Sequence, residues 1–238
     1  MGQKKGICYI VGAGDFSIEE LIAAGINKKE KCDAKDILIA VDGGFDHLKN
    51  TAFIPDVIIG DFDSIEDIEE VRSKKVSQST IITVNKEKDE TDTLLAVRHG
   101  IEDGYDTFFI FGAMGGTRLD HTIANIQVIS YLCNRRKKGF LIDQSNIITA
   151  IKDGKIDFEP NFSGRISVFA YSDYAKEVNE IGLKYLVNAD DLTSDISRGI
   201  SNEFVGKQAC VSVREGTLLI FLETKNNMEL IFEREKKA

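Results

Sequence analysis

The sequence lacks long apolar runs, an excess of positive charge and closely spaced cysteines. No apolar stretch reaches the roughly 18 residues that a transmembrane helix needs. The formal net charge of −9 argues against a protein that binds nucleic acids or membrane surfaces. The four cysteines are scattered without metal-type or redox-type spacing, and the residues after Met1 enter an apolar strand pattern instead of a signal peptide. We therefore expect a cytoplasmic protein without nucleic-acid or membrane partners.

Several common phosphate-binding signatures are also missing. The sequence contains no Gly-x-x-x-x-Gly-Lys-Ser/Thr loop, no kinase glycine loop and no kinase catalytic-loop motif. Internal repeats and low-complexity tracts are absent as well. Any phosphate chemistry must therefore depend on another arrangement.

The first half of the chain alternates between strand and helix patterns. Apolar strand patterns occupy residues 7–11, 37–41, 57–59, 81–84 and 107–111. A capping box at Ser17-Ile18-Glu19-Glu20 predicts that a helix begins there and continues to about Ile26. Further helices are expected after Gly44, over 65–71 and over 94–101, and Ile123, Ile126, Ile129 and Leu132 mark one face of another. This alternation predicts a doubly wound, largely parallel α/β/α domain.

The second half of the chain has a different pattern. Short apolar runs at 165–171, 209–213, 217–222 and 228–232 are divided by turn signals such as Glu215-Gly216. These runs predict an all-β domain of sandwich type. With 238 residues and 42% hydrophobic content, the chain has room for two modest domains. We expect an α/β domain at 1–135 and a β-sandwich domain at 140–238.

Two closely spaced carboxylates follow the third predicted strand. Asp61 and Asp63 emerge where an α/β sheet places its ligand crevice. In extended backbone, residues two apart share a face, so both carboxylates can point at one hard cation such as Mg²⁺. The alternative interpretation is a solvated Asp-x-Asp turn with Ser64 as a helix cap.

Other strand ends carry polar residues that suit phosphate and metal binding. Asp92 is a further candidate metal ligand, with Asp42 and Asp89 nearby. The pairs Gly43-Gly44 and Gly115-Gly116 allow a backbone to approach a phosphate. Arg118 and Lys88 are candidates to neutralise phosphate charge.

Each of these segments also has a purely structural interpretation. Residues 88–92 can be an acidic helix start that matches the helix dipole. Residues 118–121 can be a salt-bridged helix start with a capping His121, although their position after a double glycine favours a functional role. The turn at 12–16 is either a phosphate-binding loop or a structural one. His47 and His99 fit ordinary helix patterns and are interpreted as structural.

Together with a segment far downstream, these motifs resemble the thiamine pyrophosphokinase (thiamine diphosphokinase) family. The likeness spans nearly the whole chain and keeps the family's motif order. The motifs are Asp42-Gly43-Gly44, Gly60-Asp61-Phe62-Asp63-Ser64, Lys88-Asp89-Glu90-Thr91-Asp92, the run from Gly115 to Asn125, and Ser201-Asn202-Glu203-Phe204.

The resemblance implies an enzyme that transfers the pyrophosphoryl group of ATP to the hydroxyl of thiamine, giving thiamine diphosphate and AMP. It also implies a homodimer with active sites between subunits. By this likeness, Mg²⁺ would be bound by Asp61, Asp63 and Asp92, and catalysis would involve these three with Arg118 and Asp120. The ATP site would comprise Asp42, Gly43, Gly44, Lys88, Asp89, Thr91, Gly115, Gly116, Arg118, Asp120, His121 and Asn125.

Ser201 and Asn202 would bind the pyrimidine edge of thiamine, since a hydroxyl and an amide offer both donors and acceptors. Members of this family can stack a tryptophan on thiamine, but this chain has none, which makes Phe204 and Tyr185 the candidate replacements. No general base stands out, although Asp92 could accept the hydroxyl proton. Two alternatives stay open: transfer to another hydroxymethyl heterocycle such as a pterin, and a non-catalytic sensor of thiamine diphosphate or a nucleotide.

Overall fold

The computed structural model describes residues 6–26, 35–61, 79–85, 89–225 and 227–237. The first part contains β1 (Ile7–Val11), α1 (Ile18–Ala23), β2 (Ile37–Val41), α2 (Gly44–Leu48), β3 (Val57–Gly60), β4 (Thr80–Thr83), α4 (Asp92–Glu102), β5 (Thr107–Phe111), α5 (Leu119–Asn134) and β6 (Lys138–Ile142). The second part contains β7 (Asn146–Lys152), β8 (Lys155–Phe158), β9 (Arg165–Ala170), β10 (Tyr174–Ile181), β11 (Val187–Thr193), β12 (Asn202–Glu203), β13 (Ala209–Ser212), β14 (Thr217–Glu223) and α6 (Met228–Lys237).

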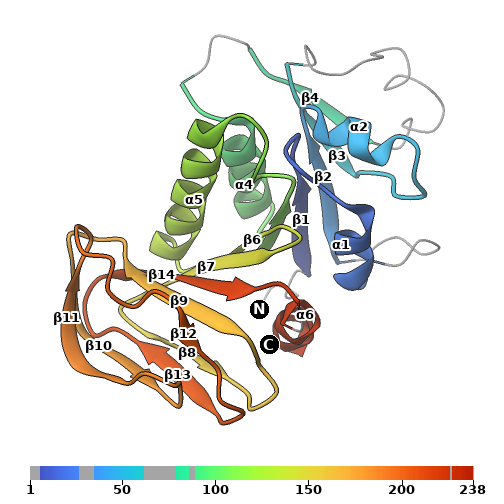
Figure 1. The fold of residues 1–238 in the computed structure, drawn as a ribbon. Coiled ribbons are helices and arrows are strands. Elements are labelled where there is room, and N and C mark those ends of the chain that lie inside the picture. Colours follow the sequence, from blue (N-terminus) through green and yellow to red (C-terminus); the bar gives the residue numbers. More distant parts are fainter. Residues whose placement is uncertain (1–5, 27–34, 62–78, 86–88, 226, 238) are drawn as a thin grey trace.

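A 10-stranded sheet runs through both parts in the order β12-β9-β14-β7-β6-β5-β1-β2-β3-β4 (Figure 1). The strands from β6 to β4 pair in parallel. From β7 onward the pairing is antiparallel, and a second, 4-stranded sheet, β11-β10-β13-β8, faces that end. We call β7 to β14 the sandwich. The predicted fold class, a doubly wound α/β part followed by an antiparallel β part, is confirmed.

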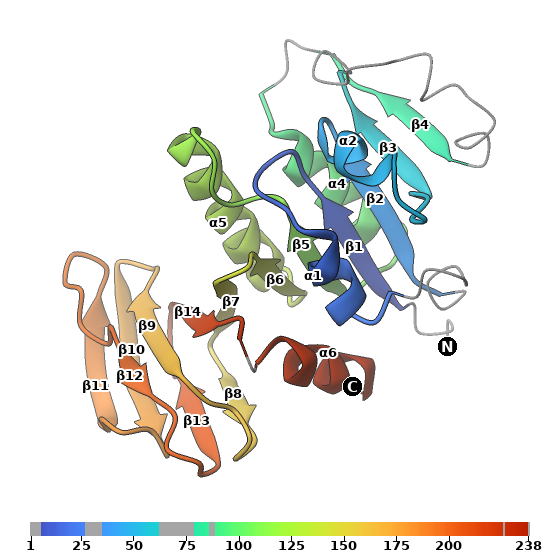
Figure 2. The ribbon, with the colours of Figure 1, turned by 45° about the vertical axis from the view of Figure 1, so that its right-hand side comes forward.

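Helices cover both faces of the parallel strands (Figure 2). Alternate residues of β1 divide between the two faces, because side chains in a strand point to opposite sides. Tyr9 packs in the core that includes α1, α2 and α6, whereas Cys8 and Ile10 pack in the core that includes α4 and α5. The first of these cores continues into the interior of the sandwich, so the two parts share one apolar interior.

The C-terminal segment differs from the prediction. The run Met228–Phe232 was expected to be a strand, but it forms the start of α6. Met228, Ile231 and Phe232 are buried at helical spacing, and the Phe232 ring lies 4.3 Å from that of Phe109 on β5. The prediction was wrong because a short apolar run does not separate strand from buried helix. This helix packs back on the α/β part, although the predicted boundary assigns it to the second domain.

Smaller differences concern the first helix. α1 ends at Ala23, earlier than the predicted Ile26, and the predicted capping box does not form. The Ser17 hydroxyl bonds to Glu19 instead of capping the helix backbone. The helix expected over 65–71 lies outside the described residues. Among the helices that the structure describes, none is long and apolar enough to cross a membrane.

Candidate active site

The order of the parallel strands reverses between β1 and β5, which is where open α/β sheets form a ligand crevice. The loops after these two strands lie directly against each other. Gly14 N–H donates to the Gly112 carbonyl at 2.7 Å, and Gly12 N–H donates to the Phe111 carbonyl at 2.8 Å. A Cβ on Gly12 would lie 2.6 Å from the Gly112 oxygen, so the close approach of the two loops requires glycine there.

A pocket of about 1070 Å³ opens at this reversal point. Its walls are the loops that follow β1, β2, β5 and β6 and the start of α4. The lining residues are Gly12, Ala13, Gly14, Asp15, Phe16, Val41, Asp42, His47, Glu90, Thr91, Asp92, Thr93, Gly112, Ala113, Met114, Gly115, Gly116, Thr117, Arg118, His121, Thr122, Asn125, Asp143, Gln144 and Ser145. The pocket therefore brings together several of the segments that the sequence predicted as functional.

Two of the predicted acidic residues, Asp42 and Asp92, line the pocket. Asp42 N–H donates to the Ile59 carbonyl at 2.9 Å, which links the ends of β2 and β3. A Cβ on Gly60 would collide with the Asp42 carboxylate, so this carboxylate packs beside the residue that precedes Asp61. Asp61 is half-buried at the end of β3 but does not line the pocket, and Asp63 lies outside the described residues.

The donor chemistry of this end of the pocket fits a divalent cation. Carboxylate oxygens are the ligands that hard cations prefer, and Asp42 and Asp92 both line this cavity. Within the described residues, no group of three or more His, Cys, Asp or Glu side chains is arranged to hold a metal ion.

The start of α4 combines a structural and a pocket-lining role. The Thr91 hydroxyl accepts from Leu94 N–H at 3.3 Å and so caps the helix, and Asp92 is the first helical residue. Both side chains also line the pocket. Asp89 is exposed and does not line the pocket, and Lys88 lies outside the described residues.

The loop between β5 and α5 forms another wall. Gly115 and Gly116 have φ angles of 74° and 69°, and Gly116 N–H donates to Asp15 at 3.1 Å. The Asn125 amide, which is buried, donates to the Ala113 carbonyl at 2.7 Å and so ties the loop to α5. His121 lines the pocket, and its backbone N–H donates to the Arg118 carbonyl.

Arg118 and Asp120 form a two-point ion pair at the start of α5. The two hydrogen bonds measure 2.9 and 2.7 Å, and both side chains are exposed. These hydrogen bonds lower the pKa of Asp120 to about 2. Arg118 lines the pocket, whereas Asp120 does not. The Arg118 guanidinium is therefore already paired with the Asp120 carboxylate, and a phosphate in the pocket would have to compete with Asp120 for it.

Gly43 and Gly44 do not line the pocket. Gly44 approaches the backbone of β1 so closely that a Cβ would collide with the Val11 carbonyl. Gly44 therefore permits the close approach of the start of α2 to the end of β1.

The sequence interpretation missed two parts of the pocket. His47 was interpreted as structural, but it lines the pocket, with Nε2 3.0 Å from the Gly14 carbonyl and its ring 5.2 Å from Phe16. The segment 143–145 after β6 was not singled out, because β6 was not recognised as a strand. The only signal for it was a polar turn after the apolar run 140–142.

Ser201 and Asn202 lie in the sandwich and not in this pocket. Ser201 is exposed, with a φ of 60°, whereas Asn202 is only 3% exposed. Phe204 is buried against Phe158, at 5.2 Å between ring centres. Tyr185, at 59% exposed, is the more accessible of the two aromatic candidates.

The fold and the pocket define an α/β enzyme of two parts, with a polar crevice at the sheet reversal and an antiparallel β part attached. The family described as "Thiamin pyrophosphokinase, catalytic domain" matches residues 29–141, and "Thiamin pyrophosphokinase, vitamin B1 binding domain" matches residues 145–218. The chain belongs to the thiamin pyrophosphokinase family, and it is a transferase of thiamine diphosphate biosynthesis.

Individual relatives agree with this assignment. The chain is 33% identical over 193 residues to the thiamine pyrophosphokinase of Bacillus subtilis, covering 81% of this chain and 89% of that protein. The crystal structure of a Bacillus subtilis thiamine pyrophosphokinase superposes with a TM-score of 0.79 at 29% identity, covering 92% of this chain and 99% of the other. The yeast thiamin pyrophosphokinase structure shares the fold, with a TM-score of 0.72 at 17% identity over 96% and 90% of the two chains.

Proposed function

We propose that this chain transfers the pyrophosphoryl group of ATP to the primary hydroxyl of thiamine, releasing AMP and thiamine diphosphate. The hydroxyl oxygen attacks the β-phosphorus of ATP, and the bond from that phosphorus to the α-phosphate oxygen breaks. The observation that carries the proposal is the pocket at the sheet reversal, where glycine loops, Arg118 and carboxylates share one cavity. The family assignment supports thiamine as the acceptor, and the polar pocket with Arg118 supports ATP as the donor.

The pocket offers what phosphoryl-type transfer needs. This reaction depends on positioning and charge stabilisation more than on covalent chemistry by the protein. The glycine loops lack side chains that would keep a phosphate away from the backbone, and Arg118 can exchange its bond to Asp120 for a phosphate. The volume of about 1070 Å³ lies just above the usual range of about 300–1,000 Å³ for one small-molecule site, which suits two substrates in contact.

The metal in this proposal is Mg²⁺, with Asp61, Asp63 and Asp92 as ligands and Asp42 beside them. These carboxylates would hold the cation, whose charge would supply neutralisation of the negative charge that develops during transfer. Asp92 lies at the N-terminus of α4 and lines the cavity that would hold the phosphates, which supports its role as a ligand. It is also our candidate to accept the proton of the thiamine hydroxyl.

We further propose a homodimer whose active sites lie between subunits. The pocket is lined by residues of the α/β part and of the loop after β6, whereas the proposed thiamine subsite at Ser201 and Asn202 belongs to the sandwich. Exposed apolar side chains occur at both places: Leu119 at 70% near the pocket, and Leu186 and Ile200 on the sandwich. A second copy would cover these surfaces and bring a sandwich to each pocket.

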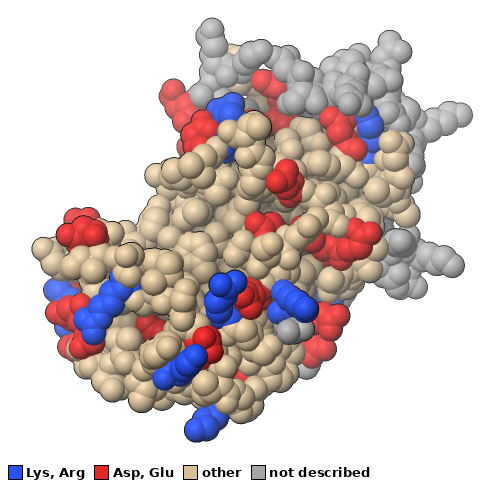
Figure 3. Space-filling model, in the orientation of Figure 1, with Lys and Arg blue, Asp and Glu red and all other residues tan. Residues whose placement is uncertain are grey.

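Two further parts of the proposal concern partners and location. Figure 3 shows a face on which Lys and Arg are interspersed with Asp and Glu instead of forming a continuous basic surface, which supports a protein without nucleic-acid partners. The cysteines Cys8, Cys133 and Cys210 are free thiols, which supports a cytoplasmic location.

A product assay tests the reaction. Purified protein is incubated with ATP, Mg²⁺ and thiamine, and adenine nucleotides and thiamine phosphates are separated on one column. Equal amounts of AMP and thiamine diphosphate are expected. Formation of ADP with thiamine monophosphate would contradict pyrophosphoryl transfer, and the absence of any thiamine-dependent product in folded protein would contradict thiamine as acceptor.

A further inference from the structure

A carboxylate lies in the apolar interior of the sandwich. Glu180 on β10 is 0% exposed and follows Ala175 and Val178, which are also fully buried. Its strand neighbours in register are Val187 on β11 and Val211 on β13. Strand patterning predicts an apolar residue at a core-facing position, so a carboxylate at this position departs from the expected pattern.

The carboxylate holds one specific amide. Glu180 Oε2 accepts from Asn202 Nδ2 at 2.8 Å. Within the described part of the chain, Oε1 makes no hydrogen bond. A Cβ on Gly199 would lie 3.4 Å from this Oε1, so the carboxylate lies beneath the turn that leads to Ser201. Burial raises the pKa of the Glu180 carboxyl, while the bond to Asn202 and the charge of Arg198 oppose this shift.

Asn202 uses its whole hydrogen-bonding capacity on this chain. Its Nδ2 also donates to the Tyr185 carbonyl at 2.7 Å, and its Oδ1 accepts from Tyr185 N–H and Glu203 N–H, both at 2.9 Å. An amide offers two donor hydrogens and two acceptor positions, so none is left for a ligand. The Asn202 side chain therefore orders its neighbours instead of contacting a substrate in this arrangement.

The neighbours that it orders are exposed. Tyr185 presents its ring to solvent, with Lys184 Nζ 5.5 Å from the ring centre. Ser201 is exposed next to Asn202, and its backbone N–H donates to Ser167 Oγ at 3.0 Å. The Asn202 amide thus joins the Tyr185 loop to the turn that carries Ser201, and its fully buried bond goes to Glu180.

We propose that Glu180 is a positioning residue, which orients the Asn202 amide and thereby holds Tyr185 and Ser201 in the arrangement that receives thiamine. This inference rests on the proposed function, because it takes the surface at Ser201 as the thiamine subsite. Loss of the Glu180 acceptor alone leaves the buried Asn202 Nδ2 donor without this partner, which lowers stability. The positioning role is therefore tested by a selective change in KM for thiamine and not by stability.

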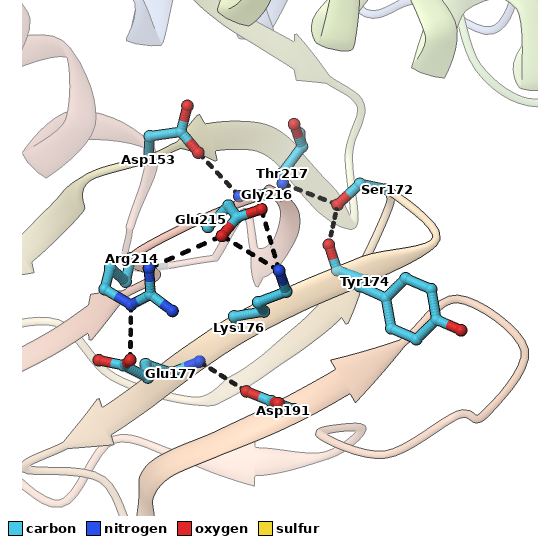
Figure 4. A network of polar contacts seen from close by, with 10 residues as sticks. All are labelled: Asp153, Ser172, Tyr174, Lys176, Glu177, Asp191, Arg214, Glu215, Gly216 and Thr217. Carbon is cyan, nitrogen blue, oxygen red and sulfur yellow. Dashed lines mark hydrogen bonds and ion pairs between the residues drawn. The ribbon is translucent and has the colours of Figure 1, made fainter.

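The test compares two variants at Glu180 with a matched control. Glu180→Met removes the acceptor and keeps the volume, whereas Glu180→Gln keeps an acceptor for Asn202. The control is Glu177→Met, the same change on the exposed side of β10, where Glu177 belongs to a surface network with Arg214 and Asp191 (Figure 4). KM for thiamine, KM for ATP, kcat and the Tm are measured for each.

Glu180→Met is expected to raise KM for thiamine by about 10- to 100-fold, with KM for ATP near that of the wild type and a Tm lowered by several degrees. Glu180→Gln and Glu177→Met should retain wild-type values. A wild-type KM for thiamine in Glu180→Met would overturn the inference, and so would an equal loss of affinity for thiamine and ATP. If neither Glu180→Met nor Glu180→Leu folds, Glu180 is structural and the inference is overturned.

Failure of the inference is distinguishable from failure of the proposed function. If wild-type protein turns over thiamine and Ser201→Arg impairs it, an unaffected Glu180→Met overturns the positioning role alone. If folded wild-type protein makes no product from ATP and thiamine, the proposed function fails, and the positioning role fails with it.

Discussion

Asp15 and Gly116 are 101 positions apart in the chain, yet the Asp15 carboxylate accepts the Gly116 N–H at 3.1 Å. This bond joins the loop after β1 to the loop after β5 at the point where the strand order reverses. A Cβ on Gly115 would collide with the same carboxylate, so Asp15 packs directly under the double glycine. The floor of the pocket is therefore stabilised by a contact between its two main loops.

Loss of this contact should weaken ATP binding. Asp15→Ala removes the acceptor, and a hydrogen bond of this kind contributes about 1 kcal/mol, so KM for ATP is expected to rise about fivefold to tenfold. Asp15→Asn keeps an acceptor oxygen and serves as the control. Steady-state kinetics at saturating thiamine would measure the effect. An unchanged KM for ATP in Asp15→Ala would show that the loop bond does not shape the nucleotide site.

Substitutions at the neighbouring residues Thr91 and Asp92 should have different effects, the first mainly on stability and the second mainly on turnover. Thr91→Val removes the hydroxyl that caps α4, and loss of such a cap costs about 1 kcal/mol of unfolding free energy. Asp92→Asn keeps the shape but removes a proposed metal ligand, so turnover should fall by at least about 100-fold with little change in Tm. Turnover across a Mg²⁺ titration and thermal unfolding are measured for both. Wild-type turnover in Asp92→Asn would rule out its metal role.

Subunit mixing tests whether the active site is shared. Asp92→Asn disables the α/β side, and Ser201→Arg places a bulky cation on the proposed thiamine surface. If each site combines the α/β part of one subunit with the sandwich of the other, a mixed dimer holds one intact site. Unfolding and refolding the two inactive variants together should therefore restore activity that neither has alone. Activity that stays absent in mixed dimers, after control refolding of wild type succeeds, would argue for a site within one subunit.

Glu20 should make stability depend on pH. Its side chain is buried, and burial together with the nearby charge of Asp143 raises its pKa to about 7 from the ordinary value of 4.5. The folded state therefore holds this proton more tightly than the unfolded state. The resulting stabilisation is complete below about pH 4.5 and is lost as pH rises to about 7 and above.

Glu20→Gln is expected to remove this dependence and to raise the unfolding free energy at pH 8 by up to about 3 kcal/mol. Denaturant unfolding at pH 5 and pH 8 measures it, and exposed Glu19→Gln on the same helix is the control. An equal pH dependence in wild type and Glu20→Gln would mean that this carboxyl does not carry the effect.

Local patterns predicted most of the α/β part correctly. The strands 37–41 and 107–111 have the predicted bounds, because continuous apolar runs bounded by polar turns are typical of buried parallel strands. The same reasoning failed at Met228, where a run of similar composition forms α6, since its partner is the distant Phe109. It also placed Asp42 and Asp92 correctly at strand and helix ends, and both line the pocket.

The sequence by itself determined the alternation of strands and helices and the polar residues at their ends, because both depend on neighbours within a few positions. Only the tertiary structure decided which of these strand and helix ends lie next to one another. His47 and the segment 143–145 join the pocket only through the order of the strands, and Asp15 reaches Gly116 only because β1 pairs with β5. The tertiary structure also buries Asn202, and its amide therefore bonds to Glu180 inside the sandwich. These contacts join residues far apart in the chain, and no local pattern specifies them.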